Sequence, residues 1–189
     1  MSTQFPGVHS VQFYEHEDKL IKSVGAMFAA SVSFGDAAVV VATPEHRNAI
    51  ARELESFGVD VPRCSSEGRY VSLDASQVLL SVMRSGQPDR KLFDANFCSM
   101  LREVRQRAKN QNRGLTVYGE CVALLWKHGQ KQAALTLERF WHEVFRTDRT
   151  FHLHCGYPAS AFAEESEIRL IRTLHSQVFL QSVSQGSAV

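Results

Sequence analysis

The chain has 189 residues, of which 44% are hydrophobic and 22% are charged, and its formal net charge at pH 7 is +1. This length suits one α/β domain with a sizeable core. The near-neutral balance of charges gives no electrostatic case for nucleic acid, whose partners usually carry a basic excess. No apolar run approaches the roughly 20 residues of a membrane span, and the first ten residues lack the pattern of a secretory signal.

The cysteines are scattered along the chain and form no C-x-x-C pair; they are Cys64, Cys98, Cys121 and Cys155. This distribution is typical of a reduced protein and not of a disulfide scaffold. We therefore expect a soluble cytoplasmic domain that contacts neither nucleic acid nor membrane.

Strand-like and helical segments alternate from the start of the chain. The sequence predicts a first strand over residues 9–15 and an amphipathic helix over residues 18–35. Residues 36–43 form an uninterrupted apolar run, the pattern of a strand covered on both faces. A second helix is expected after Thr43, a natural N-cap followed by proline, and it should end at Gly58.

The middle of the chain continues the alternation. A third strand is expected over residues 68–76, with Asp74 placed to cap a short helix that runs to Gly86. A long amphipathic helix is expected over residues 87–110. The fourth strand follows over residues 114–120, ending in a glycine and a glutamate.

The last third contains a helix over residues 130–145, a fifth strand over residues 151–158 and a final helix over residues 164–179, followed by a frayed tail. We divide the chain into a domain over residues 1–163 and a helix and tail over residues 164–189, packed on the same domain. The final helix carries one apolar stripe, formed by Ile168, Ile171, Leu174 and Val178. Either this stripe covers the sheet, or the helix also binds a partner or a second copy of the chain.

Strands alternating with helices predict an α/β fold: a doubly wound, largely parallel five-stranded sheet with helices on both faces. In such sheets, ligands bind beyond the carboxyl ends of the strands. We therefore expect a ligand-binding rim formed by residues that end or follow strands: Tyr14, Glu15, His16, Thr43, His46, Asp74, Glu120, Cys121, Cys155 and Tyr157. His9 opens its strand, so we expect it on the opposite rim, away from these residues.

A phosphate-binding loop would be expected after the first strand, where the sequence is YEHEDKLIKSV. This segment has no G-x-x-x-x-G-K-[ST] motif and no glycine before Gly25. Without glycines the backbone cannot wrap a phosphate, and Glu15, Glu17 and Asp18 would repel one. ATP hydrolysis is therefore not expected.

The neighbours Glu120 and Cys121 have three interpretations. In the first, Glu120 ends the strand in solvent or caps the next helix, and Cys121 is a small buried hydrophobe. In the second, both are polar points in a ligand pocket. In the third, Cys121 is a reactive thiol at a helix N-terminus, although the adjacent carboxylate opposes thiolate formation.

Metal binding at the rim is a further possibility, because zinc suits the side chains of His16, His46, Cys121 and Cys155. These residues lie on separate segments, and nothing in their spacing demands a metal. His152 and His154 alternate along a strand, so both face one side, where one can be a satisfied core histidine. We assign no catalytic residue, no metal and no cofactor from the sequence.

Several motifs together resemble the MEDS domain, a sensory domain typified by the dichloromethane-responsive regulator DcmR. They are HSVQFYEHEDKL, GDAAVVVATPEHRNAIARELESFGVDV, GRYVSLDAS, GQPDRKLF, YGECVALLWKHGQKQAALTLERFWHEV and FHLHCGYP, spread over about Val8 to Pro158. The resemblance implies a sensory module of prokaryotic signal transduction that detects small hydrocarbon derivatives and occurs alone or joined to histidine kinase or DNA-binding domains.

The layout is also similar to the RecA/KaiC-like ATPase core, here without its phosphate loop. That comparison implies that the fourth and fifth strands flank the first, which would bring Tyr14, Glu120 and Cys155 close together. We expect a standalone sensory module of bacterial signal transduction that binds a small molecule. It would act through a partner histidine kinase or transcriptional regulator, or by forming a homodimer through the C-terminal helix. The alternatives are a small-molecule enzyme that uses Glu120 with Cys121 or a histidine, and a non-catalytic protein-interaction adaptor.

Overall fold

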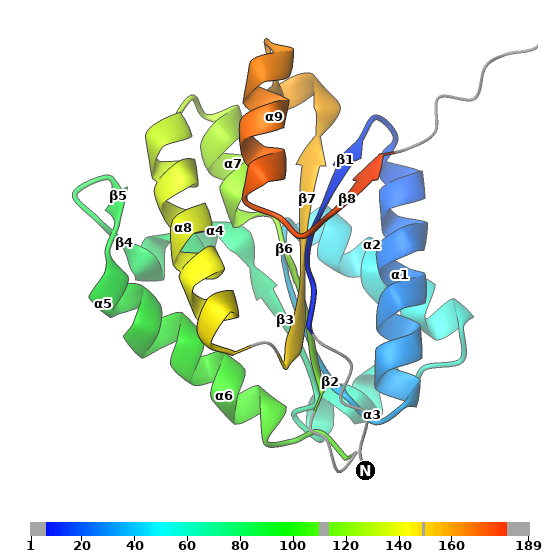
Figure 1. The fold of residues 1–189 in the computed structure, drawn as a ribbon. Coiled ribbons are helices and arrows are strands. Elements are labelled where there is room, and N and C mark those ends of the chain that lie inside the picture. Colours follow the sequence, from blue (N-terminus) through cyan, green and yellow to red (C-terminus); the bar gives the residue numbers. More distant parts are fainter. Residues whose placement is uncertain (1–6, 110–113, 149, 181–189) are drawn as a thin grey trace, which may run out of the picture.

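The computed structural model describes residues 7–109, 114–148 and 150–180. Its centre is a parallel sheet with the strand order β3-β2-β6-β7-β1-β8 (Figure 1). The strands are β1 (His9–Tyr14), β2 (Ala37–Ala42), β3 (Tyr70–Asp74), β6 (Leu115–Gly119), β7 (Phe151–Pro158) and β8 (Gln177–Leu180). Because the strands run parallel, their carboxyl ends all open onto the same edge of the sheet.

Helices cover both faces of this sheet (Figure 1). They are α1 (Glu17–Ser33), α2 (Pro44–Ser56), α3 (Val61–Ser66), α4 (Ala75–Val82), α5 (Arg90–Leu92), α6 (Ser99–Arg105), α7 (Cys121–Lys127), α8 (Lys131–Thr147) and α9 (Glu165–Thr173). A π-helical segment, Phe93–Cys98, joins α5 to α6, and a 3₁₀ turn, Ala159–Ala161, follows β7. A short antiparallel hairpin of β4 (Met83–Arg84) and β5 (Gln87–Pro88) lies between α4 and α5.

The strand β2 shows why the sheet needs helices on both faces. Its six residues, AAVVVA, are all buried. Ala37, Val39 and Val41 pack into the core beneath the α4–α8 layer, whereas Ala38, Val40 and Ala42 pack into the core beneath α1 and α2. Side chains of a strand alternate between faces, so a continuous apolar run is stable only where both faces are covered. The prediction of a doubly wound α/β fold is confirmed.

All five predicted strands form, but the sheet has a sixth. We expected a helix through Phe179, whereas α9 ends at Thr173 and the chain continues into β8, parallel to β1. Val178 therefore pairs with Val11 in the sheet and does not belong to the helical stripe. The physical reason is that β1 would otherwise be an edge strand with unpaired backbone groups, and the last strand satisfies them.

The strand order also corrects the expected neighbours of β1. The fifth predicted strand, β7, lies beside β1, but the fourth, β6, lies on the far side of β7. The expectation that both flank β1 is wrong.

The segment after β3 differs from its prediction too. The hairpin of β4 and β5 occupies residues for which helix was expected, with φ values of +49° at Ser85 and +76° at Gly86 in its turn. Two consecutive positive φ values are the geometry of a tight hairpin turn, which the glycine permits. The long helix consequently begins only at Arg90. The helix α3 was not predicted at all.

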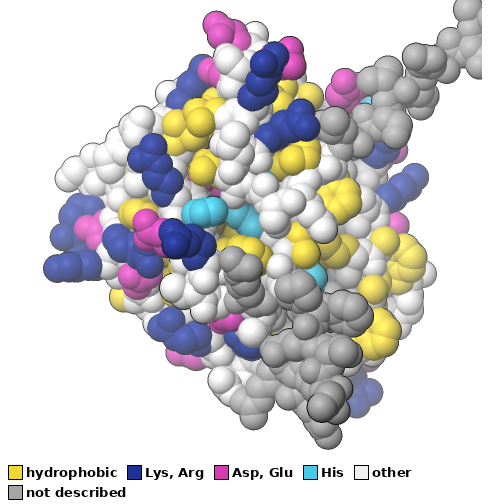
Figure 2. Space-filling view, viewed as in Figure 1, with side chains coloured by type: hydrophobic (Ala, Val, Ile, Leu, Met, Phe, Trp, Pro, Cys, Tyr) yellow, Lys and Arg dark blue, Asp and Glu magenta, His cyan; other side chains and the backbone are white. Residues whose placement is uncertain are grey.

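Acidic and basic side chains are interspersed over α5, α6 and α8 (Figure 2). Ion pairs such as Arg105–Asp148, 2.8 Å apart, connect these helices. Partly exposed pairs of this kind contribute little stability, so the apolar core holds the layers together. Within the described residues, no helix combines the length and the apolar character needed to cross a membrane.

Candidate functional site

A pocket of about 430 Å³ lies at the carboxyl edge of the sheet, beyond the ends of β1, β2, β6 and β7. We call it the rim pocket. It is lined by Tyr14, Glu17, Thr43, Glu45, His46, Glu120, Ala123, Leu124, Lys127, Pro158, Ser160 and Ala161. Four of the ten residues predicted for the rim line this pocket: Tyr14, Thr43, His46 and Glu120.

The start of α2 forms one wall. Thr43 is the N-cap, and its side-chain oxygen accepts a hydrogen bond from the His46 N–H at 3.4 Å, with proline at the first helical position, as the sequence predicts. This cap fixes the first turn of the helix, so the His46 side chain projects toward the end of β6. There the Glu120 N–H donates to the carbonyl of Val41 at 3.0 Å, which extends the sheet pairing by one residue.

The Glu120 carboxyl group forms the polar floor of the pocket. The residue is only 4% exposed, and its Oε2 accepts a hydrogen bond from the Thr43 N–H at 3.0 Å. Its Oε1 accepts one from the Tyr118 hydroxyl at 2.7 Å and another from Nδ1 of His46. Three donors on two segments, the start of α2 and the strand β6, therefore hold one buried side chain in a fixed position.

His46 is tuned by this arrangement. The hydrogen bond to Glu120 is the largest of the effects that raise the pKa of His46 above its usual 6.5, and the charge of Glu17 adds to it. Nε2 of His46 lies 3.7 Å from the Glu17 carboxylate at the pocket mouth. Because hydrogen bonding and nearby negative charge favour the imidazolium form, the pocket holds a positive group beside its buried carboxylate.

Tyr14 completes the wall on the side of β1. Its ring meets the ring of His46 edge-on, with 6.3 Å between the centroids. Burial, together with the charges of Glu120 and Glu17, raises the pKa of the Tyr14 phenol. The phenol therefore keeps its proton and offers an apolar ring and a hydrogen-bond donor to anything in the pocket.

The structure separates Glu120 from Cys121. Glu120 neither ends in solvent nor caps α7 with its side chain, so the first interpretation is wrong for this residue. Cys121 begins α7 on the opposite face of the sheet, where its thiol donates to the carbonyl of Ala75 at 3.6 Å. Burial, followed by the charge of Glu120, raises the pKa of the Cys121 thiol to about 12. Cys121 is a small buried hydrophobe and not an activated nucleophile.

Three other predicted rim residues lie outside the lining of the pocket. Glu15 and His16 form the exposed two-residue connection between β1 and α1. Asp74 caps α4, as predicted, by accepting hydrogen bonds from the N–H groups of Ser76 and Gln77 at 2.9 and 3.1 Å. These residues shape the edge of the sheet but do not line the rim pocket.

Cys155 and Tyr157 do not reach the rim. The strand β7 runs on to Pro158, so Cys155 lies in its middle, and both side chains are buried beneath α8. The resemblance implied that Cys155 lies close to Tyr14 and Glu120, but Cys155 does not line the pocket that those two residues share. The metal site considered for the rim does not form. Cys121 and Cys155 lie in the core beneath the α4–α8 layer, whereas Tyr14 lies in the core on the other face of the sheet, where its ring contacts His46.

His9 is the largest surprise on this opposite face. It opens β1 as expected, but in the parallel register it pairs with Leu153, two residues before Cys155. Side chains two apart on neighbouring strands share a face, and Nε2 of His9 lies 3.7 Å from Sγ of Cys155. The expectation that His9 stays away from the other predicted residues is wrong.

His154 is the satisfied core histidine that the sequence analysis considered. Its Nδ1 pairs with the Ser10 hydroxyl at 2.8 Å, and its Nε2 lies 3.1 Å from Oε1 of Gln12. Burial lowers the pKa of His154 to about 4, so the ring is neutral in the core.

Sequence reasoning missed Tyr118, Glu138 and His175. For Glu138 a signal existed: it lies four residues after Ala134 and three before Trp141, on the apolar stripe of its helix, where a carboxylate is out of place. His175 gave no such signal, because the sequence placed it inside the predicted helix over residues 164–179, whereas α9 ends at Thr173.

A second cavity lies inside the core beneath the α4–α8 layer. Its volume is about 20 Å³, and its lining is almost entirely apolar: Val41, Val78, Val82, Phe93, Phe97, Val117, Gly119, Cys121, Val122, Leu137, Trp141, Leu153 and Cys155. A space of this size holds on the order of one water molecule.

The fold and the rim pocket define a small α/β domain whose ligand pocket would lie at the carboxyl ends of parallel strands. The chain belongs to the MEDS family, described as the MEthanogen/methylotroph, DcmR Sensory domain, which matches residues 8–176. MEDS is a sensory domain of signal transduction. A comparison with curated proteins found no match.

Proposed function

We propose that this chain is a cytoplasmic sensory module of bacterial signal transduction that binds a small hydrocarbon derivative in the rim pocket. It would act through a partner histidine kinase or transcriptional regulator. Membership of a sensory family supports the general role. The observation that carries the choice of site is the buried carboxyl group of Glu120, fixed by three donors at the floor of an otherwise accessible pocket.

Volume favours the rim pocket over the internal cavity as the ligand site. Ligand pockets usually occupy about 300–1,000 Å³ and combine apolar walls with a few fixed polar groups. The rim pocket, at about 430 Å³, falls in this range and has apolar walls at Ala123, Leu124 and Pro158. The internal cavity, at about 20 Å³, would have to expand before it could admit an organic molecule.

The charges of the rim pocket suggest which derivatives fit. Three carboxyl groups line it, from Glu17, Glu45 and Glu120, against the two basic side chains of His46 and Lys127. An anionic ligand would meet an excess of negative charge, whereas an alcohol or an amine can donate hydrogen bonds to a carboxylate. We therefore expect a small, neutral or cationic hydrogen-bond donor.

The sensor hypothesis can be tested by ligand-induced thermal stabilisation. A panel of small alcohols, amines, aldehydes and halocarbons is screened against the full chain, and each hit is measured again on Glu120→Gln. A ligand that binds only the folded state adds about 2.7 kcal/mol of stability at a hundredfold excess over Kd. We expect this ligand-induced stabilisation to be much smaller in Glu120→Gln.

Asp74→Asn is the matched control, because it removes a rim carboxylate that does not line the pocket and leaves a residue that caps helices about as well. Its ligand response should equal that of the wild-type chain. If every hit stabilises Glu120→Gln and the wild-type chain equally, the ligand does not bind at the rim pocket. If no compound stabilises the wild-type chain, the non-catalytic adaptor becomes the better hypothesis.

One observation favours the enzyme as a second candidate. Glu120 and His46 form a carboxylate–imidazole pair at a pocket, an arrangement that orients a histidine for general acid–base chemistry. If a hit from the panel is converted to product, and turnover is lost in His46→Gln but not in Cys121→Ser, this hypothesis replaces the sensor. Binding without turnover contradicts it.

A further inference from the structure

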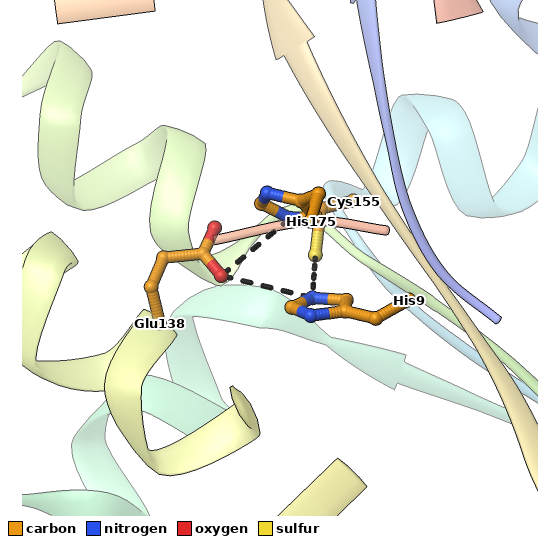
Figure 3. Close-up of side chains that lie close together, drawn as sticks. All are labelled: His9, Glu138, Cys155 and His175. Atoms are coloured by element: carbon orange, nitrogen blue, oxygen red, sulfur yellow. Dashed lines mark hydrogen bonds and ion pairs between the residues drawn. The ribbon is translucent and has the colours of Figure 1, made fainter. Parts of the chain in front are cut away.

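Four side chains with metal-binding atoms meet beside α8, in the core on that face of the sheet (Figure 3). His9 comes from the start of β1, Cys155 from the middle of β7, Glu138 from α8, and His175 from the link between α9 and β8. One ligand atom from each lies within 4.8 Å of the other three. His9, Glu138 and Cys155 are buried, and the side chain of His175 has no exposed surface.

The distances from the Glu138 carboxylate to the two imidazoles of this cluster are too long for hydrogen bonds. Oε2 of Glu138 lies 3.8 Å from Nε2 of His9 and 3.6 Å from Nε2 of His175. A direct charge-assisted hydrogen bond between these groups would measure about 2.7–2.9 Å. Oε2 of Glu138 and Nε2 of His175 are in fact buried without a hydrogen-bond partner among the described residues. Buried polar atoms without partners destabilise a fold, so their convergence needs a cause.

The same distances match the edges of a metal coordination shell. Tetrahedral zinc with bonds of about 2.0–2.1 Å to nitrogen and oxygen and about 2.3 Å to sulfur places N and O ligands about 3.4 Å apart, and N and S ligands about 3.6 Å apart. The observed N–O separations are 3.6 and 3.8 Å, and the separation of Nε2 of His9 from Sγ of Cys155 is 3.7 Å. The remaining separations between ligand atoms are within 4.8 Å, so a contraction of the cluster would complete the shell.

Neighbouring groups orient the ligands toward this centre. Nδ1 of His175 lies 2.8 Å from the carbonyl of Ile171, which can only accept, so Nδ1 carries the hydrogen and Nε2 presents its lone pair to the cluster. Oε1 of Glu138 accepts a hydrogen bond from the Tyr157 hydroxyl at 2.8 Å, which leaves Oε2 for the centre. Such partners of the ligands are typical of metal sites.

The backbone also holds two of the segments together. The Ser176 N–H donates to the carbonyl of His9 at 2.8 Å, and the His9 N–H donates to Oγ of Ser176 at 3.1 Å. Because His175 directly precedes Ser176, its ring is kept beside the ring of His9, with 4.1 Å between the centroids. Two histidines that are far apart in the sequence are thus placed next to each other before any ion binds.

We propose that His9, Glu138, Cys155 and His175 form a binding site for one divalent transition-metal ion, with Zn²⁺ as the best match, which ties the segment between α9 and β8 to the sheet. This site is separate from the rim pocket and does not depend on the ligand-sensing proposal. On binding, a Zn–S bond forms as the Cys155 thiol releases its proton to solvent, and any proton on Glu138 leaves in the same way. The two imidazoles donate lone pairs.

The charge balance suits a buried centre. One carboxylate and one thiolate offset the two positive charges of the ion, and neutral imidazoles add none, so the complete site has no net charge. Four protein ligands fill a tetrahedral shell, which is the arrangement of structural zinc sites.

The test uses Co²⁺ as a spectroscopic probe and Zn²⁺ as its competitor on the full chain after treatment with a chelator. We expect one Co²⁺ per chain, with a thiolate-to-cobalt charge-transfer band and the visible absorption of tetrahedral cobalt, both displaced by Zn²⁺. Cys155→Ser should lose the charge-transfer band, and His175→Gln should bind the ion at least about a hundredfold more weakly.

Cys98→Ser is the matched control, because Cys98 is a buried cysteine outside the cluster. The Co²⁺ spectrum of this variant should equal that of the wild-type chain. Tyr157→Phe removes only the hydrogen bond to Glu138, and we expect it to keep both bands while the affinity falls about 10–100-fold. If the folded wild-type chain binds no Co²⁺, or if its Co²⁺ complex lacks the thiolate band, the proposal is overturned. The wild-type titration decides this even where a variant does not fold.

Discussion

Replacing Glu120 with glutamine should lower the free energy of unfolding by an amount that depends on pH. The carboxyl group accepts hydrogen bonds from Thr43, Tyr118 and His46. A glutamine side chain has one acceptor oxygen and one NH₂ group. If its oxygen serves Tyr118 and His46, the NH₂ group faces the Thr43 N–H, and this buried donor loses its acceptor at a cost of about 1–3 kcal/mol.

A second contribution comes from His46. Its pKa in the folded chain is raised above 6.5, chiefly by the hydrogen bond to Glu120. The protonated ring therefore contributes stability that is complete below about pH 6.5 and is lost as the pH rises through the folded-state pKa. A hydrogen bond between charged partners exceeds a neutral one by about 1 kcal/mol. Glu120→Gln should thus cost about 2–4 kcal/mol near pH 6 and about 1 kcal/mol less near pH 9.

Urea denaturation of both chains at about pH 6 and about pH 9 measures this difference. Glu17 from α1 and Tyr14 from β1 also face His46, but they are the same in both chains, so their effects cancel in the comparison. Glu45→Gln, at an exposed residue of the same pocket, is the control and should change stability by no more than about 0.5 kcal/mol. An equal loss at both pH values for Glu120→Gln would refute the role assigned to the pair.

Gly156→Ala should destabilise the fold by about 1–3 kcal/mol, because its Cβ would overlap the Tyr118 hydroxyl; the loss should be less than additive with Tyr118→Phe in chemical denaturation. Calorimetry should detect no magnesium-dependent ATP binding, since a glycine-free, two-residue connection joins β1 to α1; tight binding would contradict this. Truncation after Ala163 should abolish the cooperative thermal transition, because it removes β8 and the fully buried Ile171, and a stable folded fragment would count against it. Leu170→Glu should preserve the fold, because Leu170 is 44% exposed. If α9 is the output surface, this variant should also self-associate less, which light scattering measures as a lower average molecular mass. An average mass equal to that of the wild-type chain excludes that surface.

The parts of the fold that were predictable are those with a local pattern. The apolar run of β2, the cap at Thr43 and the cap at Asp74 each express their structure within a few residues, and the structure agrees with all three. The strand β8 was missed because its four residues continue a helical pattern, and only the open edge of β1 makes them a strand.

The site was predictable only in part, for a similar reason. The rule that ligands bind at carboxyl ends of strands located Glu120 and His46 correctly at one pocket. Cys155 was wrongly assigned to this edge, because it lies three residues before the end of β7 and its side chain points into the core. The meeting of Cys155 with His9 follows from the parallel register of these two strands, which no local pattern in either segment specifies.

The most direct test of the sensory account is to map where a ligand from the panel binds, by following the backbone amide signals of isotope-labelled protein in NMR. The account predicts that titration shifts the amides of Tyr14, Thr43, His46 and Glu120, which line the rim pocket on three separate segments. It also predicts that Glu120→Gln abolishes these shifts. Shifts confined to residues around the internal cavity, such as Phe97 and Trp141, would contradict the account and place the ligand in the apolar core.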